Sequence, residues 1–316
     1  MTPDRNVITP NGAATAVVLL RAAASAARDV GARCSDASAK RPVSGSLRAL
    51  ELAEARATSG GGGVTRLRLL KETVSRCQVL HGHLVLLTDS VADCFIAAST
   101  RDGAINGPGL AAACRPVLEL FALISWLLED GIGAAERGRR LLVWQFHELR
   151  ETRRGIDPNI ATADHAIENL VAMEDETRRL AVAAQWATTD PLTKKGKPCP
   201  AALLTTGSTK EPEPMPSTST LVERFAPGQY DLLSAVIHPS FLVILAGTKS
   251  TTEHNELRVG GIGLHPQHAL LIVARALAAS HGALAHWYGL DVGRFDGAVQ
   301  DLTAMTWAEP APASLT

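Results

Sequence analysis

Apolar residues recur at helical spacing along most of the chain, and the longest such run covers residues 64–98. Its apolar positions are Leu67, Leu70, Val74, Cys77, Leu80, Leu84, Leu87, Val91 and Phe95. Residues three or four apart form one stripe along an α-helix, so this pattern predicts a long core helix. The turn-forming cluster Asp102-Gly103 and Asn106-Gly107-Pro108-Gly109 follows it. We therefore expect the chain to reverse direction between 101 and 109.

The same periodicity predicts several more helices. Three of them cover residues 110–128, 134–154 and 162–187, and their short connections favour antiparallel neighbours. A helix restarts near Thr220, which forms a capping-box pattern with Glu223. Later helices are expected over residues 229–238, 266–288 and 293–307, with Pro266 in the first turn of the second of these. The pattern predicts an all-α protein built as an antiparallel helical bundle.

Changes of composition suggest how the chain is divided. Residues 1–63 hold two Ala-rich helical patches, at 13–28 and 46–57, and end in four glycines that favour a flexible joint. Residues 188–219 are rich in Pro, Thr and Lys, which is typical of a long loop. In the segment 241–264 a short apolar run, 241–245, leads to polar residues that fit either a loop or a small hairpin. We expect an N-terminal helical appendage and linker at 1–63, a bundle at 64–306 interrupted by the loop at 188–219, and a tail at 307–316.

Composition and charge limit the functional classes. The chain has 316 residues, of which 46% are hydrophobic and 20% charged, and its formal net charge is -1. This balance gives no global electrostatic reason to bind nucleic acid or a membrane surface. The five cysteines form no C-x-x-C pair and are typical of reduced, mostly buried thiols. No leader pattern is visible, and the apolar stretches 116–128 and 232–247 are shorter than the roughly 20 residues needed to cross a bilayer, so we expect a cytoplasmic protein without a membrane partner.

Two groups of polar residues fall within apolar helical patterns. Tyr230, Ser234 and His238 stand at positions i, i+4 and i+8, on one stripe of a helix. Each buried polar group costs roughly 1–3 kcal/mol if it lacks a partner, so this stripe must meet protein, water or a ligand. Arg115 and Glu119 stand at i and i+4 in the apolar helix 110–128. They form either an ion pair that fixes helix register or part of a single polar network with the stripe.

For the other candidate sites, a structural or solvent-exposed role is the favoured explanation. Asp89 and Asp93 could hold a cation or share a proton, but exposure or an arginine on a neighbouring helix is the favoured explanation. The chain lacks the paired Glu-x-x-His motifs of a ferritin-like di-metal bundle. His81 and His83 point to different helix faces, and no third ligand accompanies His265 with His268. His281 and His286 are best explained as satisfied interface or core positions.

No cofactor or nucleophile motif is complete. The chain contains no Gly-x-Ser-x-Gly motif and no phosphate-binding loop motif. Gly260-Gly-Ile-Gly263 matches the dinucleotide-binding motif only in part. Lys194–Lys197 is a small positive loop that is best explained as solvated charge. We therefore predict neither a metal nor a cofactor.

The two polar motifs carry a family resemblance. Arg115-Pro-Val-Leu-Glu119 and Tyr230-Asp-Leu-Leu-Ser-Ala-Val-Ile-His238 resemble motifs of uncharacterised bacterial helical proteins that are similar to HEPN-type bundles. The resemblance covers about residues 64–306. It implies RNA cleavage or nucleotide binding, often in toxin or antiviral settings. In a ribonuclease of this type His238 would act as general acid or base, Arg115 would hold the phosphate and Glu119 would orient Arg115.

One departure from the family weakens the enzyme interpretation. The ribonuclease motif needs an arginine followed by four to six residues and then histidine, whereas Asp231, Leu232 and Leu233 stand at the corresponding positions here. Two classes stay open: a non-catalytic bundle, with a homodimer as one assembly, that binds RNA, a nucleotide or a protein partner; and a metal-independent ribonuclease using His238. A carrier of a small apolar ligand would need a large dry cavity, which nothing in the sequence indicates.

Overall fold

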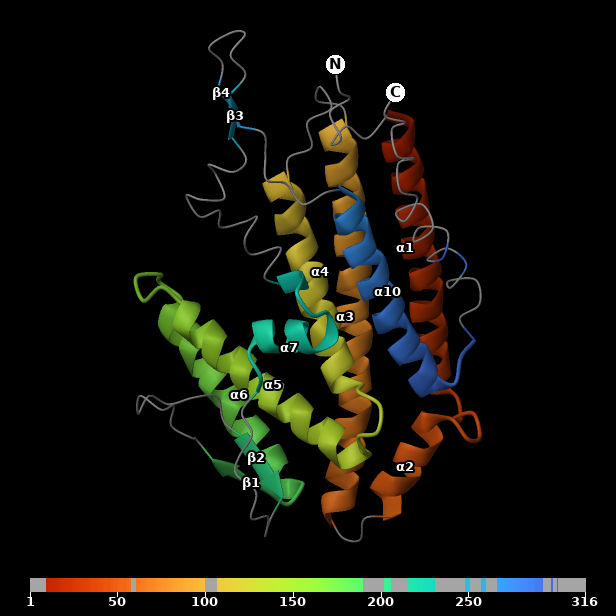
Figure 1. Cartoon of the computed structure of the whole chain (residues 1–316). Coiled ribbons are helices and arrows are strands. Elements are labelled where there is room, and N and C mark those ends of the chain that lie inside the picture. The colour runs from red at the N-terminus through yellow and green to blue at the C-terminus, as the bar shows by residue number, and fades with distance from the viewer. Residues whose placement is uncertain are drawn as a thin grey trace. The chain divides into compact units, whose positions relative to one another are not determined.

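The computed structural model describes residues 10–57, 61–99, 107–189, 202–205, 215–230, 248–250, 257–259 and 266–291, with the single residues 297 and 300 (Figure 1). Most of these residues are helical, which confirms the prediction of a mainly α-helical chain. The helices are α1 (Pro10–Ala39), α2 (Leu47–Ala57), α3 (Gly61–Ser99), α4 (Gly107–Leu127), α5 (Ala134–Gly155), α6 (Ala163–Ala183), α7 (Thr218–Phe225) and α10 (Pro266–Tyr288). The strands are β1 (Trp186–Thr189), β2 (Ala202–Thr205), β3 (Thr248–Ser250) and β4 (Leu257–Val259).

Contacts between residues divide the chain into two compact units. The first unit includes α1, α3 from Gln78 onward, α4 up to Trp126, α7 and α10. The second unit includes α2, α3 up to Cys77, α5, α6, β1 and β2. This division differs from the boundary that we drew at residue 63, because α1 groups with α10 and α2 groups with α5. Helix α3 also begins at Gly61, inside the glycine run that we expected to be a joint.

The alanine-rich composition is explained by the packing of the first unit, where α1 lies beside α10 (Figure 1). The buried alanines of the two helices are Ala16, Ala23, Ala24, Ala27, Ala269, Ala274, Ala276 and Ala285. The distance between packed helices depends on the side chains at the contact, so small residues let these two backbones approach closely. Alanine therefore serves here as a packing residue as well as a helix former.

In the second unit α5 packs beside α6, and a buried ion pair ties α5 to α2. Arg137 Nε lies 2.7 Å from Glu51 Oε1, and the two side chains are 0% and 3% exposed. Arg137 also donates from Nη1 to the carbonyl oxygen of Leu127 at 3.0 Å. The next residue, Gly138, is tightly packed, since a Cβ there would lie 3.2 Å from both Leu69 Cβ and Trp186 Cη2 and would have to displace them slightly. The ion pair of Arg137 with Glu51 and the close packing of Leu69 and Trp186 against Gly138 together position α5.

Residues 184–219 differ from the prediction. Helix α6 ends at Ala183, four residues earlier than expected, and Gln185 adopts a positive φ of 64°. Trp186–Thr189 then pairs antiparallel with Ala202–Thr205. We had predicted a helix up to residue 187 and a loop over 188–219. Trp and Thr favour strands, and this local preference ends the helix where its alanine run stops. The predicted Lys194–Lys197 loop lies outside the described residues.

The segment 241–264 was left open between a loop and a hairpin, and the structure contains a hairpin. Thr248–Ser250 pairs antiparallel with Leu257–Val259, with Lys249 opposite Arg258. The predicted last helix, 293–307, lies outside the described ranges apart from two single residues.

The predicted capping box at Thr220 is wrong. Helix α7 begins at Thr218, so Thr220 lies inside its first turn. The Glu223 carboxylate instead accepts the backbone N–H of Gly228 at 3.0 and 3.1 Å. Gly228 has a φ of 73°, a conformation that glycine adopts without strain. Glu223 therefore closes the turn after α7, which leads directly to Tyr230.

Two helical stretches are long and apolar enough, by length and composition, to cross a membrane: Gly63–Ile96 and Leu110–Leu127. Core helices of soluble proteins meet the same criterion, and 44% and 61% of the respective windows are buried inside the protein. The expectation of a cytoplasmic protein therefore remains a prediction.

We expect Glu51→Gln to lower the free energy of unfolding by about 3–5 kcal/mol, because it leaves the Arg137 charge buried without its counter-charge. Urea unfolding of the purified variant measures this. Replacing both partners, as Glu51→Leu with Arg137→Met, should recover most of the loss. The control is Glu176→Gln, which breaks the exposed pair with Arg179 and should cost less than about 1 kcal/mol. Equal losses in the two single variants would contradict the role assigned to the buried pair.

Candidate functional site

Three of the five residues singled out by the sequence form one contact chain in the first unit. Arg115 Nε on α4 donates to Glu119 Oε1 at 2.9 Å, one turn further along the same helix. Arg115 Nη2 donates to the hydroxyl oxygen of Tyr230 at 2.6 Å. The guanidinium carbon also lies 5.0 Å from the centre of the Tyr230 ring, within the range of a cation–π contact. Ser234 and His238 lie outside the described residues.

The electrostatics of this cluster keep Arg115 charged and occupied. The hydrogen bond to Glu119 raises the pKa of Arg115 above its ordinary value, and the Tyr230 hydroxyl adds to the effect. The side chains of Arg115 and Glu119 are 30% and 34% exposed, so water screens part of their attraction. The cluster holds residue 230 against α4 across 115 positions of sequence. The cluster therefore positions the turn between α7 and Tyr230.

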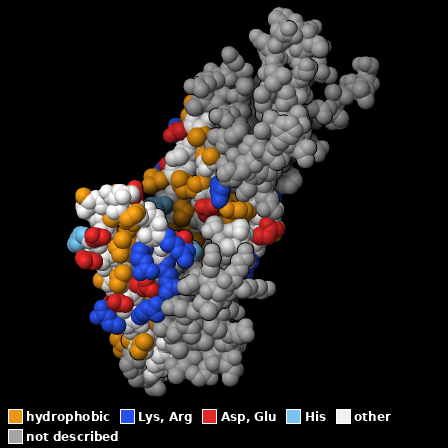
Figure 2. All heavy atoms as spheres, turned by 90° about the vertical axis from the view of Figure 1, so that its left-hand side faces the viewer, with side chains coloured by type: hydrophobic (Ala, Val, Ile, Leu, Met, Phe, Trp, Pro, Cys, Tyr) orange, Lys and Arg blue, Asp and Glu red, His pale blue; other side chains and the backbone are white. Residues whose placement is uncertain are grey.

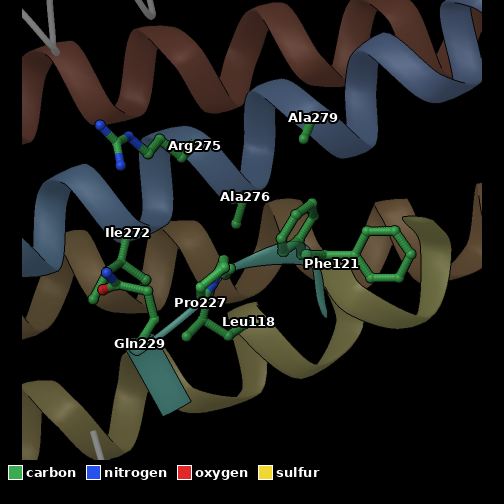
Figure 3. Close-up of a pocket in the computed structure, with 10 residues that line it drawn as sticks. Leu118, Phe121, Pro227, Gln229, Ile272, Arg275, Ala276 and Ala279 are labelled. Carbon is green, nitrogen blue, oxygen red and sulfur yellow. The ribbon is translucent and has the colours of Figure 1, made fainter. Parts of the chain in front are cut away.

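A pocket of about 240 Å³ lies beside this cluster, in the same unit. Leu118 and Phe121 of α4 line one side. Phe225 at the end of α7 lines another side, together with Ala226, Pro227 and Gln229. Figure 3 shows Ile272, Ala276 and Ala279 of α10 facing this space. The ring centres of Phe121 and Phe225 are 6.4 Å apart, with their planes close to perpendicular. Sequence reasoning missed the pocket because its walls come from three segments whose separate patterns indicate only helix and turn.

Asp89 and Asp93 are explained by arginines of α1. Asp93 Oδ1 lies 2.8 Å from Arg21 Nη2, and Asp89 pairs with Arg28. These pairs confirm the favoured explanation, an arginine partner on a neighbouring helix. Within the ranges that the structure describes, no three His, Cys, Asp or Glu side chains are grouped as metal ligands. His265 and His268 have no described side-chain environment, and Gly260-Gly-Ile-Gly263 lies outside the described residues.

The arginines of α5 and α6 gather around one carboxylate in the second unit. Glu174 Oε1 accepts hydrogen bonds from Arg150 at 3.1 Å and from Arg178 at 3.0 Å, while its Oε2 lies 3.5 Å from Arg153. Figure 2 shows basic side chains gathered on this face, with acidic ones among them. Burial raises the pKa of Glu174, but the bonds and charges of Arg150 and Arg178 outweigh burial and hold the pKa below its ordinary value. The shared carboxylate ties α5 to α6.

The contact between two buried histidines was not foreseen, although His281 was expected at an interface or core position. The rings of His81 on α3 and His281 on α10 have centres 5.9 Å apart in the first unit. His81 is 2% exposed and His281 is fully buried. His83 points to another face of the helix, as predicted, and is exposed. Burial lowers the pKa of both rings, and that of His281 falls to about 3 because His81 and Arg33 add to the effect. The two histidines are therefore neutral core residues at neutral pH.

We expect acid to destabilise the protein through this histidine pair. Between pH 6.5 and about 3 the unfolded chain protonates His281 while the folded chain does not, so stability falls as pH falls. The slope approaches 1.4 kcal/mol per pH unit for each such group, or about 2 kcal/mol between pH 6.5 and 5. Urea unfolding at pH 7.5, 6 and 5 measures it.

The variant His281→Gln should flatten this pH dependence by the share of one histidine. The same change at the exposed His83 of α3 is the matched surface control. Above pH 5 the carboxylates stay ionised, which separates their effect from that of the histidines. A His281→Gln profile parallel to the original would contradict this assignment.

Comparison of the chain with protein-family models, with characterised proteins and with solved structures gives no significant match. The HEPN-like resemblance therefore stays a prediction that rests on the two short motifs.

Proposed function

We propose that this chain is a non-catalytic binding module, built as a HEPN-like antiparallel helical bundle and working in the bacterial cytoplasm, in a defence setting. The observation that carries this proposal is the occupied guanidinium of Arg115, which bonds to Glu119 and to Tyr230. The paired positions on α1 and α3 support the antiparallel arrangement, because Arg21 meets Asp93 while Arg28 meets Asp89. Sequence numbers rise along one helix as they fall along the other.

The occupied arginine argues for binding rather than for catalysis. Cleavage of RNA develops negative charge on phosphate, and a catalytic cation must be free to stabilise it in the transition state. Arg115 is balanced by a carboxylate 2.9 Å away, and its second bond goes to a tyrosine hydroxyl. The family position for a catalytic arginine holds Asp231, Leu232 and Leu233. The cluster is therefore a structural tie rather than a catalytic site, and the function that we propose is binding of RNA, a nucleotide or a protein partner.

The first experiment asks whether the protein cleaves a mixed RNA pool in the presence of a chelator. We expect no cleavage by the wild-type chain, and no difference from His238→Ala once circular dichroism shows that both are folded. Binding of the same RNA pool, followed by a mobility shift, then distinguishes an RNA partner from the other classes. Chelator-resistant cleavage that disappears in His238→Ala would overturn the proposal in favour of a metal-independent ribonuclease.

A structural tie also predicts a stability effect. Tyr230→Phe keeps the ring under the Arg115 guanidinium but removes the hydroxyl acceptor, so we expect it to lower the free energy of unfolding by about 1–2 kcal/mol. Tyr288→Phe is a matched control, because it removes a hydroxyl that accepts a neutral bond of 2.9 Å from Gln78. Raising the salt concentration should reduce the effect at Tyr230 more than the effect at Tyr288, since only the first involves a charged donor. A stability unaffected by Tyr230→Phe would remove the structural role.

A further inference from the structure

The pocket beside the Arg115 cluster has an apolar interior that is large enough for a small molecule. Its apolar lining residues are Leu118, Phe121, Phe225, Ala226, Pro227, Ile272, Ala276 and Ala279. Four of these, Leu118, Phe121, Ile272 and Ala276, form the floor and are at most 6% exposed. The floor is therefore part of the hydrophobic core, and a ligand gains its affinity mainly by covering this apolar surface.

The charge of the lining decides which ligands the pocket accepts. Arg275 is the one charged residue among the described residues that line it. Figure 3 shows the Arg275 guanidinium directed away from the pocket interior, so only the aliphatic stem of this side chain contributes to the wall. An ion that entered the pocket would lose water without meeting an opposite charge, which is unfavourable. The described lining therefore favours a neutral ligand.

One polar side chain is placed to orient such a ligand. Gln229 lies in the turn after α7, and Figure 3 shows its carboxamide close to Ile272 of α10. The backbone N–H of Gln229 donates to the carbonyl oxygen of Ala226 at 3.2 Å. Its carboxamide makes no hydrogen bond with any other residue that the structure describes. Because a carboxamide offers both a donor and an acceptor, it can pair with an amide or a hydroxyl group of a ligand.

The volume limits the ligand to about one ring. An apolar cavity of about 150 Å³ holds benzene. The pocket measures about 240 Å³, which leaves roughly 90 Å³ for a polar group of a few non-hydrogen atoms. Phe121 and Phe225 favour an aromatic ring, because their own rings already meet edge to face, with centres 6.4 Å apart, and a third ring can extend this arrangement. A nucleotide or a long acyl chain exceeds this space.

We infer that the pocket formed by α4, the turn at 225–229 and α10 binds a neutral molecule of one aromatic ring, whose single polar group bonds to the Gln229 carboxamide. The inference goes beyond the proposed function, since RNA, a nucleotide and a protein partner are all too large for this pocket. It shares one element with that function, the bond from Arg115 to Tyr230. Tyr230 directly follows Gln229, so this bond holds the wall that carries Gln229 against α4.

Titration calorimetry of the full chain with benzamide tests the inference, with benzoate as a charged probe of the same shape. We expect benzamide to bind with a dissociation constant on the order of 1 mM, given its small number of atoms. Benzoate should bind at least about tenfold more weakly, because its carboxylate loses water without gaining a counter-charge. No heat of binding with benzamide at 10 mM, or benzoate binding as tight as that of benzamide, would overturn the inference.

The variant Gln229→Leu separates the hydrogen bond from apolar burial. Leucine has a similar size but neither donor nor acceptor, so benzamide should bind about tenfold more weakly to the variant. Toluene makes no hydrogen bond and should bind equally well to the variant and to the original chain. An unchanged affinity for benzamide would overturn the role of Gln229.

A second variant shows whether binding occurs in this pocket. Ala279→Leu places a larger side chain at the exposed edge of the pocket and should weaken benzamide binding at least about tenfold. Ala22→Leu is the matched control, because it makes the same change at an exposed residue of α1 that does not line the pocket, and it should bind benzamide normally. Circular dichroism first shows that both variants are folded. Equal binding by the two variants would overturn the location of the site.

The outcomes are separate from those of the RNA experiment. A chain that binds no benzamide and cleaves no RNA loses the ligand site but keeps its proposed function. A chain that cleaves RNA loses the proposed function, whatever the titration shows.

Discussion

The buried ion pair between Arg137 and Glu51 is the strongest single constraint on the second unit. Its two charges lie almost wholly out of water, where each would be costly alone, so α2 and α5 must keep one relative position. The carbonyl oxygen of Leu127 accepts a further hydrogen bond from Arg137. This bond holds Leu127, the last residue of α4, against α5. Apolar contacts alone would tolerate small shifts along the helices. The hydrogen-bonded ion pair between Arg137 and Glu51 does not, because it requires one geometry.

The polar cluster of the first unit works under different physical conditions. Arg115 and Glu119 are about one-third exposed, so their attraction is screened and its contribution to stability is modest. Its structural importance is that it connects segments distant in sequence, because it joins α4 to the turn that follows α7. That turn brings Phe225 and Gln229 into the lining of the pocket, next to residues of α4 and α10. A weak tie between distant segments thus defines the geometry of the candidate site.

The sequence predicted the parts of the fold that depend on local pattern. Helices α3, α4, α5 and α10 lie within a few residues of their expected ranges, since apolar periodicity is encoded by neighbours in the chain. Partners were harder to predict: the Ala-rich pattern of α1 indicated a helix but not its packing against α10. Local preference favours a strand at Trp186, but its pairing with Ala202–Thr205 and the pairing of His81 with His281 depend on residues elsewhere in the sequence, and no local spacing indicates those partners. For the candidate site, the sequence singled out Arg115, Glu119 and Tyr230, while the pocket beside them could be seen only in three dimensions.

Gly138 lets the side chains of Leu69 and Trp186 lie directly against the backbone of α5, and the second unit must preserve this close contact. A single methyl group at this position would meet Leu69 and Trp186 at 3.2 Å, closer than comfortable van der Waals contact. The missing atom therefore acts as a spacer of fixed size, and its neighbours are fitted to it. In related chains the trace of this fit would be paired substitution: a larger residue at position 138 would accompany a smaller one at 69 or at 186.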